Sequence, residues 1–193
     1  KLYQETPEKI SADAGYGSEE NYEFLEQNQV EAYVKYNYFH KEQTKKWNED
    51  TFKVHNLYYN KDKDCFYCPM GQVMRNIGQT QRTTTTGYKQ KITLYQATNC
   101  NGCPLRGVCH DQKTNRIIQI NHNLVKHKDI ARDKLLSEQG IKHRKKRPCD
   151  VEAVFGIIKN NHSFKRFMLK GIEKVEIESG LLAIAHNLRK MAA

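Results

Sequence analysis

The residues with the clearest capacity for chemistry in this sequence are its cysteines. Two Cys-x2-Cys pairs, Cys65 with Cys68 and Cys100 with Cys103, are followed by Cys109. Tight turns with this spacing can present four thiolates to one Zn²⁺ ion at the corners of a tetrahedron. Because five cysteines exceed four ligands, either Cys65 or Cys109 is spare, and the spacing leaves that choice open. A closed site of this kind would stabilise the fold rather than catalyse a reaction, and a set of free thiols is the alternative.

Two acidic residues stand where carboxylates could bind catalytic metal ions. Asp13 follows a short apolar segment that predicts a strand, and Glu152 lies in a segment with helical periodicity. Carboxylates that hold two Mg²⁺ ions about 3.5 to 4 Å apart are the arrangement that phosphodiester cleavage uses. Taken alone, an Asp at a strand end is more often a turn former, and a helical Glu is more often a solvated charge. The hypothesis of a catalytic metal site therefore needs further support.

Positive charge gathers next to the second of these acids. Lys159 follows Glu152 by seven residues, which returns it to the same helix face. Just upstream is the basic run 142–147, and the whole chain has 32 Lys and Arg against 22 Asp and Glu, a formal net charge of +10. A run of this kind can neutralise several phosphates and release their counterions, so a nucleic acid is the expected partner. A solvated basic face is the alternative.

The composition indicates a folded but polar protein. Hydrophobic residues make up 38% of the chain, the mean hydropathy is -0.84, and no low-complexity tract is present. No apolar stretch approaches the roughly 20 residues that span a bilayer, and the N-terminus lacks the apolar segment of a signal peptide. We therefore expect no membrane partner and a cytoplasmic location, where reduced cysteines favour metal binding over disulfides.

The residues around Asp13 are predicted to form a strand, a helix and a second strand. Residues 10–14 are apolar enough for a strand end, Ser18 can cap a helix over 19–28, and residues 30–34 alternate as a strand does. Asp13 would then lie at the C-terminal end of a strand. That is where α/β sheets place their functional groups.

The remainder divides into a β-rich part and a helical part. Residues 37–120 have short aromatic and polar segments with a turn at 83–87, which indicates irregular β structure. After residue 121 helices are predicted, one of them around Glu152 and another over 173–191. The second is expected to bury an apolar stripe formed by Ile177, Leu181, Ile184 and Leu188.

Several segments resemble the DDE transposases of bacterial insertion sequences. Residues 12–21, Ala-Asp-Ala-Gly-Tyr-Gly-Ser-Glu-Glu-Asn, resemble the segment around the second catalytic Asp of that family. Residues 147–159 resemble the segment that carries the catalytic Glu. The tail that follows it in the family is resembled by residues 164–167, 170–171 and 181–188. The segments 68–71 and 100–109 are similar to the cysteine-bearing insert of one branch of the family.

The resemblance implies an α/β fold with a partial ribonuclease H-like core, namely strand-helix-strand plus C-terminal helices, and an inserted zinc-ribbon-like subdomain. The core would occupy residues 1–40 and 121–193, and the insert residues 41–120. Asp13 would end the fourth strand of the core, and Glu152 would begin its last helix.

The resemblance also implies an activity, which is metal-dependent DNA strand cleavage and strand transfer in DNA transposition. Asp13 and Glu152 would bind Mg²⁺ or Mn²⁺, and Lys159, which meets the family's Glu-x6-Lys spacing, would contact DNA at the transposon ends or the target. Further backbone contacts are expected from Arg144, Lys145, Lys146 and Arg147. The preferred ligands of a structural Zn²⁺ become Cys68, Cys100, Cys103 and Cys109, with Cys65 as the alternative.

One departure from the family concerns the first catalytic Asp, which in such enzymes lies on the first strand, well before the segment around Asp13. An N-terminal part of the transposase is therefore an expected partner, self-association is compatible with the family, and the location would be a bacterial cytoplasm near the nucleoid. The rival hypothesis is a non-catalytic zinc-containing module that binds nucleic acid through the run 142–147. A third hypothesis is that the chain is a remnant with no activity.

Overall fold

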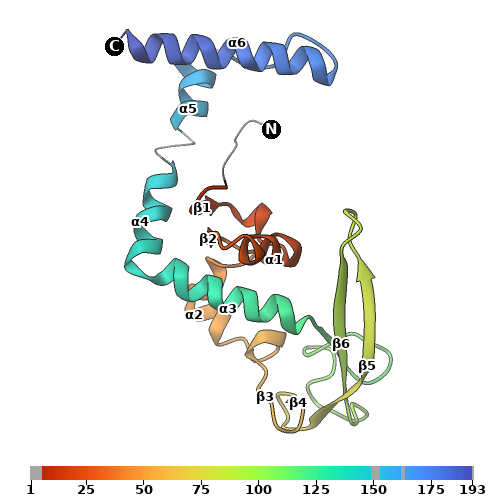
Figure 1. Ribbon diagram of the computed structural model, residues 1–193. Coiled ribbons are helices and arrows are strands. Elements are labelled where there is room, and N and C mark those ends of the chain that lie inside the picture. The colour runs from red at the N-terminus through yellow and green to blue at the C-terminus, as the bar shows by residue number, and fades with distance from the viewer. Residues whose placement is uncertain (1–5, 149–152, 162–163, 193) are drawn as a thin grey trace. The chain divides into compact units, whose positions relative to one another are not determined.

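The computed structural model describes residues 6–148, 153–161 and 164–192 (Figure 1). The chain forms two compact units, Lys1–Ser137 and Glu138–Ala193. The first contains both sheets and the helices that pack on them, and the second contains helices. Each unit is described by itself below.

The first unit begins with the predicted strand, helix and strand. Strand β1 (Lys9–Ala12) pairs in parallel with strand β2 (Glu31–Val34), and helix α1 (Glu19–Gln27) makes the crossover between them. Ser18 caps α1 as predicted, because its hydroxyl oxygen accepts a hydrogen bond from the Asn21 backbone N–H at 3.2 Å. Parallel strands need such a crossover, so the local sequence signals determine the pairing.

A hydrophobic core forms where helix α3 (His122–Leu136) packs against α1 and β2 (Figure 1). Tyr22 of α1 is buried there, and its hydroxyl donates to the Val34 carbonyl at 3.0 Å. Asn121 caps α3 by accepting from the Leu124 backbone N–H at 2.9 Å. The other buried members of this core are Tyr33, Val34, Tyr36, Phe39, Ala131 and Leu135.

Gly17 makes a close backbone approach that a larger residue cannot make. A Cβ atom at Gly17 would lie 2.3 Å from the Lys35 carbonyl oxygen, whereas a Cβ at Gly15 would meet nothing within 4 Å. We expect Gly17→Ala to lower the free energy of unfolding by about 1 to 3 kcal/mol through overpacking. Chemical denaturation measures this, with Gly15→Ala as the matched control. Equal stability of the two variants would contradict the close approach.

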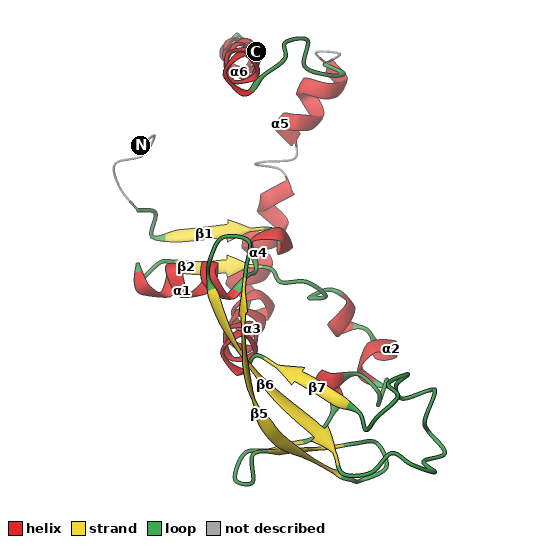
Figure 2. Cartoon of the chain, turned by 90° about the vertical axis from the view of Figure 1, so that its right-hand side faces the viewer, coloured by secondary structure: helices red, strands yellow, loops and turns green. Residues whose placement is uncertain are grey.

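The second sheet of this unit has five antiparallel strands in sequential order. They are β3 (Tyr59–Asn60), β4 (Cys65–Tyr67), β5 (Val73–Thr83), β6 (Lys89–Ala97) and β7 (Ile117–Ile120), and Figure 2 shows β5 and β6 as its longest members. The turn predicted at 83–87 joins these two strands, with the Thr84 backbone N–H donating to the Tyr88 carbonyl at 2.9 Å. The sheet buries a core that includes Leu57, Phe66, Met74, Tyr95, Ala97 and Ile118.

The segment before this sheet differs from the prediction of irregular β structure. It consists of short helical turns, Lys41–Gln43, α2 (Lys45–Asn48) and Val54–Asn56. Helices of one turn are too short to repeat an apolar position, so they leave no periodic pattern in the sequence.

Glu19 connects the two parts of the first unit. Its side chain is only 3% exposed, and its carboxylate accepts from Asn121 Nδ2 at 2.5 Å and from Asn123 Nδ2 at 2.9 Å, both near the start of α3. It also accepts from Gln90 Nε2 of β6 at 3.1 Å. One carboxylate at the start of α1 thus joins that helix to α3 and to the five-stranded sheet.

The second unit contains helices α4 (Glu138–Arg147), α5 (Ala153–Gly156) and α6 (Ile172–Met191), with a π-helical turn at Ile157–Asn161. The helix predicted over 173–191 is confirmed, but the expected burial of its apolar stripe is wrong. Ile177 and Leu181 are each 62% exposed, Ile184 is 57% exposed and Leu188 is 60% exposed. Periodicity indicates which face of a helix is apolar, and burial also needs an element packed on that face. No helix in the described part of the chain is long and apolar enough to cross a membrane.

Candidate functional site

Asp13 stands at the position predicted for it, directly after β1 at the C-terminal end of a parallel strand. Its side chain is exposed, and Oδ1 accepts a hydrogen bond from the Ala14 backbone N–H at 2.9 Å. Asp13 thereby caps the 3-10 helix Ala14–Tyr16. The turn-forming role and a metal-binding role use the same carboxylate and are compatible, because a carboxylate has two oxygens with about four acceptor sites.

The other predicted catalytic residues belong to the second unit. Glu152 lies outside the described residues, and Lys159 is an exposed residue of the π-helical turn Ile157–Asn161. The pairing of Asp13 with Glu152 and Lys159 therefore stays a prediction.

The basic run forms the last turns of helix α4. Lys142, Lys145 and Lys146 are exposed, whereas Arg144 and Arg147 are partly buried. The cations sit at the C-terminal end of the helix, where they interact favourably with its macrodipole. Lys142 and Lys145, three residues apart, share one helix face. The run is thus a helical basic surface.

Four of the five predicted zinc ligands line a single small cavity of about 20 Å³ in the first unit. These are Cys68, which follows β4, and Cys100, Cys103 and Cys109 from the loop between β6 and β7. Cys65 lies within β4, is buried, and does not line the cavity. Within the described ranges, no three His, Cys, Asp or Glu side chains are close enough together to hold a metal ion. The four cysteines thus line one cavity, but their side chains are not arranged around a common metal position.

A buried arginine that the sequence did not reveal contacts these thiols. Arg116 is 7% exposed and donates from Nη1 to Cys109 Sγ at 3.0 Å, while its backbone N–H donates to Cys100 Sγ at 3.4 Å. Nη2 donates to the Phe52 carbonyl at 2.7 Å. Only the fold brings Arg116 to the cysteines, so no sequence pattern could have indicated it.

A second polar cluster surrounds Asp64. Its Oδ1 accepts from Tyr95 Oη at 2.5 Å and Tyr59 Oη at 2.8 Å, and its Oδ2 accepts from Asn76 Nδ2 at 2.7 Å. The hydrogen bond from Tyr95, followed by that from Asn76, holds the pKa of Asp64 below its usual value. Burial, with the hydrogen bond to Asp64, raises the pKa of Tyr95 above its usual value. Tyr95 therefore stays protonated at neutral pH and donates to Asp64. The Asp64 carboxylate is the common acceptor that joins β3, β5 and β6.

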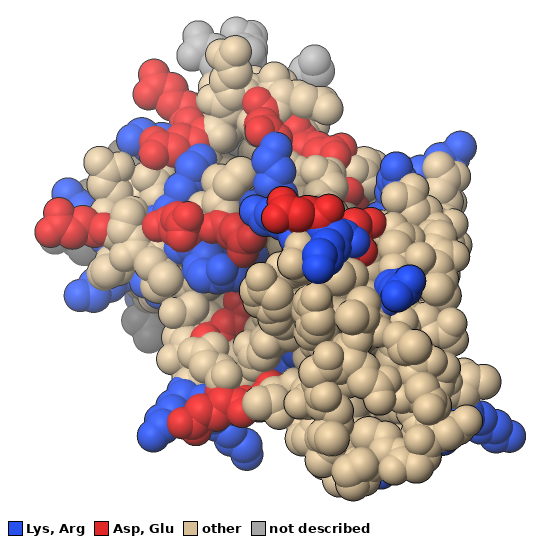
Figure 3. All heavy atoms as spheres, turned by 90° about the horizontal axis from the view of Figure 1, so that it is seen from below, with Lys and Arg blue, Asp and Glu red and all other residues tan. Residues whose placement is uncertain are grey.

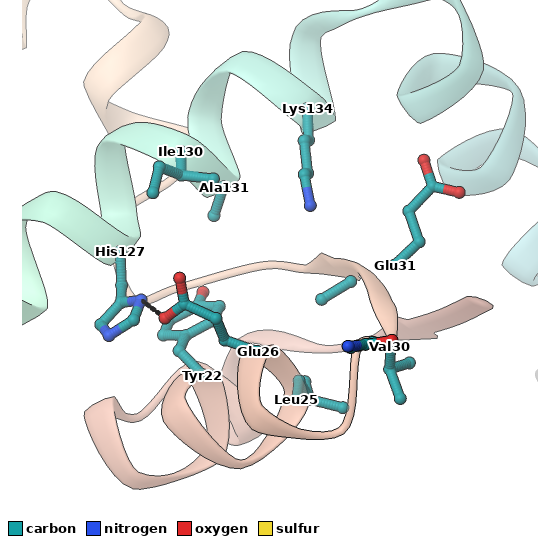
Figure 4. A pocket seen from close by; sticks show the side chains of 11 residues that line it. Tyr22, Leu25, Glu26, Val30, Glu31, His127, Ile130, Ala131 and Lys134 are labelled. Atoms are coloured by element: carbon teal, nitrogen blue, oxygen red, sulfur yellow. Dashed lines mark ion pairs between the residues drawn. The ribbon is translucent and has the colours of Figure 1, made fainter. Parts of the chain in front are cut away.

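A larger hollow of about 360 Å³ lies between α1, β2 and α3 (Figure 4). Glu26, Glu31 and Lys134 line it together with apolar side chains, and buried His127 stacks on Tyr22 with ring centroids 5.8 Å apart. His127 Nδ1 lies 4.0 Å from a Glu26 carboxylate oxygen. Among the described residues that line the hollow, none is a Ser, Cys or Thr.

Comparison with known proteins gives one match. A family model described as Transposase DDE domain matches residues 67–192, which is more than half of the chain. The matched range includes the four cysteines of the cavity, Glu152 and Lys159, and it begins after Asp13. No curated protein and no solved structure matches the chain.

Proposed function

Because the chain belongs to the family of DDE transposases, we propose that it acts in DNA transposition through metal-dependent cleavage and transfer of DNA strands. The match over residues 67–192 carries the proposal. It is supported by the position of Asp13, whose exposed carboxylate follows a parallel strand. The substrates would be the transposon ends and the target DNA.

In the proposed site, Asp13 and Glu152 would be the ligands of Mg²⁺ or Mn²⁺, for which carboxylate oxygens are suitable donors. Such ions would supply activation of the attacking oxygen and stabilisation of the leaving oxygen. The capping hydrogen bond from the Ala14 backbone N–H orients the Asp13 carboxylate before any ligand arrives. Lys159 would neutralise a nearby phosphate.

We assign backbone contacts with DNA to the basic surface of α4, namely Arg144, Lys145, Lys146 and Arg147. These cations would bind the phosphates of any duplex and release the counterions held there. The affinity for DNA would therefore fall as the salt concentration rises. A further proposed partner is an N-terminal part of the transposase that supplies the family's first Asp. The proposed location is a bacterial cytoplasm.

The experiment that tests this function is a strand-nicking assay on duplex DNA in the presence of that N-terminal part, with Mg²⁺ or with a chelator. The proposal expects nicking that needs the divalent ion. The rival function, a non-catalytic zinc-containing module that binds nucleic acid, is favoured by the cysteine cavity and by the helical basic surface. It expects binding with no nicking under any condition.

We further propose that Cys68, Cys100, Cys103 and Cys109 bind one structural Zn²⁺, with Cys65 as the alternative ligand. Their shared cavity and the Arg116 contacts to Cys100 and Cys109 support this set. Tetrathiolate sites contribute directly to folding, because the site does not exist in the unfolded chain.

Metal analysis of the purified chain is expected to find about one zinc ion per molecule, as a closed structural site requires. Cys103→Ser should lose the ion and the stability that it provides, whereas Cys65→Ser, the matched control, should keep it. If Cys65→Ser lost the zinc ion and Cys109→Ser kept it, Cys65 would be the fourth ligand in place of Cys109. A zinc-free, folded wild-type chain would overturn the proposal.

A further inference from the structure

The hairpin of β5 and β6 extends beyond the strands on either side of it. Strand β4 pairs with β5 only as far as Arg75, and β7 pairs with β6 only from Thr93. We call the two-stranded part beyond these pairings, residues 76–92, the ribbon. Figures 1 and 2 show it projecting from the rest of the sheet.

Between Gln79 and Lys91, one face of the ribbon carries amide, hydroxyl and ammonium groups. Alternation along the strand places Gln79, Gln81 and Thr83 of β5 on the same face, and the register sets Lys91 opposite Gln81 and Lys89 opposite Thr83. All five side chains are exposed. We call them the Gln-Lys face. Every group on this face can form hydrogen bonds with an external partner.

The opposite face of the ribbon is anchored to α1. Gln90 Nε2 donates to the Glu19 carboxylate at 3.1 Å, and at the tip Thr86 Oγ1 donates to the Glu20 carboxylate at 2.6 Å. Gln90 alternates with Lys89 and Lys91 along β6, so the Gln-Lys face points away from these anchors. The ribbon is therefore held in place while its Gln-Lys face stays open.

The charge of this part of the chain has one sign. From Cys65 to His110 the sequence contains no Asp or Glu and five basic residues, Arg75, Arg82, Lys89, Lys91 and Arg106. In Figure 3 the surface over the five-stranded sheet is largely uncharged, with basic side chains at its margins. The acids that contact the ribbon are Glu19 and Glu20, on the side opposite the Gln-Lys face, and Asp64 at the base of the ribbon. The charged groups on the Gln-Lys face itself are lysines, which makes this face complementary to a nucleic acid.

We propose that the Gln-Lys face enters the major groove of duplex DNA and contacts base edges there. The choice of DNA as the partner rests on the proposed function. The major groove, about 12 Å wide, admits a two-stranded ribbon. Glutamine can pair with adenine N6 and N7, and lysine with guanine O6 and N7. Residues two apart on a strand are separated by about 6.6 to 6.8 Å, which matches two base-pair steps of about 3.4 Å.

Duplex RNA fits this surface less well. Its major groove is deep and narrow, so side chains on a ribbon do not reach the base edges in it. The ribbon thus supplies sequence selectivity for DNA, and the basic surface of α4 supplies affinity for any duplex. These two contributions can be measured separately.

The test starts with selection of duplexes that the 193-residue chain binds from a random-sequence DNA library. Fluorescence anisotropy then compares a selected duplex with its scrambled version. Gln79→Ala combined with Gln81→Ala is expected to lower the preference for the selected duplex by about 25-fold or more, since each two-pronged contact contributes about fivefold or more. Replacing the purines of the duplex by 7-deaza analogues, which lack the N7 acceptor, should weaken wild-type binding in parallel.

The matched control is Gln27→Ala combined with Gln119→Ala, two exposed glutamines that lie away from the Gln-Lys face. The control should keep the full preference. Failure of the selection to enrich any sequence, or equal preference in the two double variants, would overturn the proposal, as would indifference to 7-deaza purines or equal binding of duplex RNA. Binding of all duplexes alike, combined with Mg²⁺-dependent nicking, would overturn the ribbon proposal and leave the transposition proposal standing.

Discussion

Asp13→Asn is expected to lower the rate of Mg²⁺-dependent strand nicking by about 10³-fold while leaving the affinity for DNA unchanged. A metal-binding carboxylate contributes several kcal/mol to stabilisation of the transition state, and each 1.36 kcal/mol corresponds to tenfold in rate. Asparagine keeps an oxygen that can accept from the Ala14 backbone N–H, so the cap on the 3-10 helix should persist. The nicking assay with the N-terminal part present measures the effect.

The control for this variant is Asp62→Asn, an exposed acid in the loop between β3 and β4. Its nicking rate should equal that of the wild type. An unchanged rate in Asp13→Asn would show that the catalytic assignment is wrong. A parallel loss of DNA affinity and nicking would instead assign Asp13 to binding or folding.

Glu19→Ala is expected to lower the free energy of unfolding by about 3 kcal/mol or more. The substitution removes the common acceptor of the Asn121, Asn123 and Gln90 side-chain amides. The Glu19 side chain is buried, and hydrogen bonds to a charged group contribute about 1.5 to 3 kcal/mol each. Urea denaturation followed by circular dichroism measures the change.

The neighbouring Glu20→Ala is the matched control, because the Glu20 carboxylate accepts from Thr86 Oγ1 in an exposed hydrogen bond. Its expected cost is within about 0.5 kcal/mol, as for most surface substitutions. Glu19→Gln, which keeps one acceptor oxygen, should fall between the two. Equal stability of Glu19→Ala and Glu20→Ala would show that the hydrogen bonds of Glu19 do not stabilise the packing of α1 with α3 and the five-stranded sheet.

The part of the fold that follows from local signals could be predicted from the sequence. The cap at Ser18, the apolar strand end before Asp13 and the alternation after residue 30 specify the strand-helix-strand segment, and the structure confirms it. Each of these signals operates over a few residues, so it can be read without knowledge of the tertiary fold.

Features that depend on contacts far apart in the sequence could not be predicted. Glu19 looks like an ordinary acid in the first turn of a helix, and its partners are 71 to 104 residues away. The apolar stripe of α6 illustrates the same limit, because Leu181 shows the expected periodicity yet is 62% exposed. Periodicity gives the orientation of a side chain, while burial depends on the rest of the fold.

The candidate site shows the same division. The position of Asp13 after a strand was predictable from the short apolar segment before it, and the paired Cys-x2-Cys spacing indicated that thiols would gather. The difference between Cys65 and Cys68 depends on where β4 ends, since Cys65 lies within the strand and Cys68 follows it. Strand ends are uncertain by a few residues in any sequence pattern.

The unpaired length of the ribbon exposes backbone on both sides, because neither β4 nor β7 extends along it. Open strand edges of this kind are templates on which a second chain can add a strand, which begins aggregation. Lysines on an edge oppose such pairing by charge repulsion, and Lys89 and Lys91 lie on this stretch of β6. Charge on these two lysines is therefore expected to disfavour edge-to-edge pairing between copies of the protein.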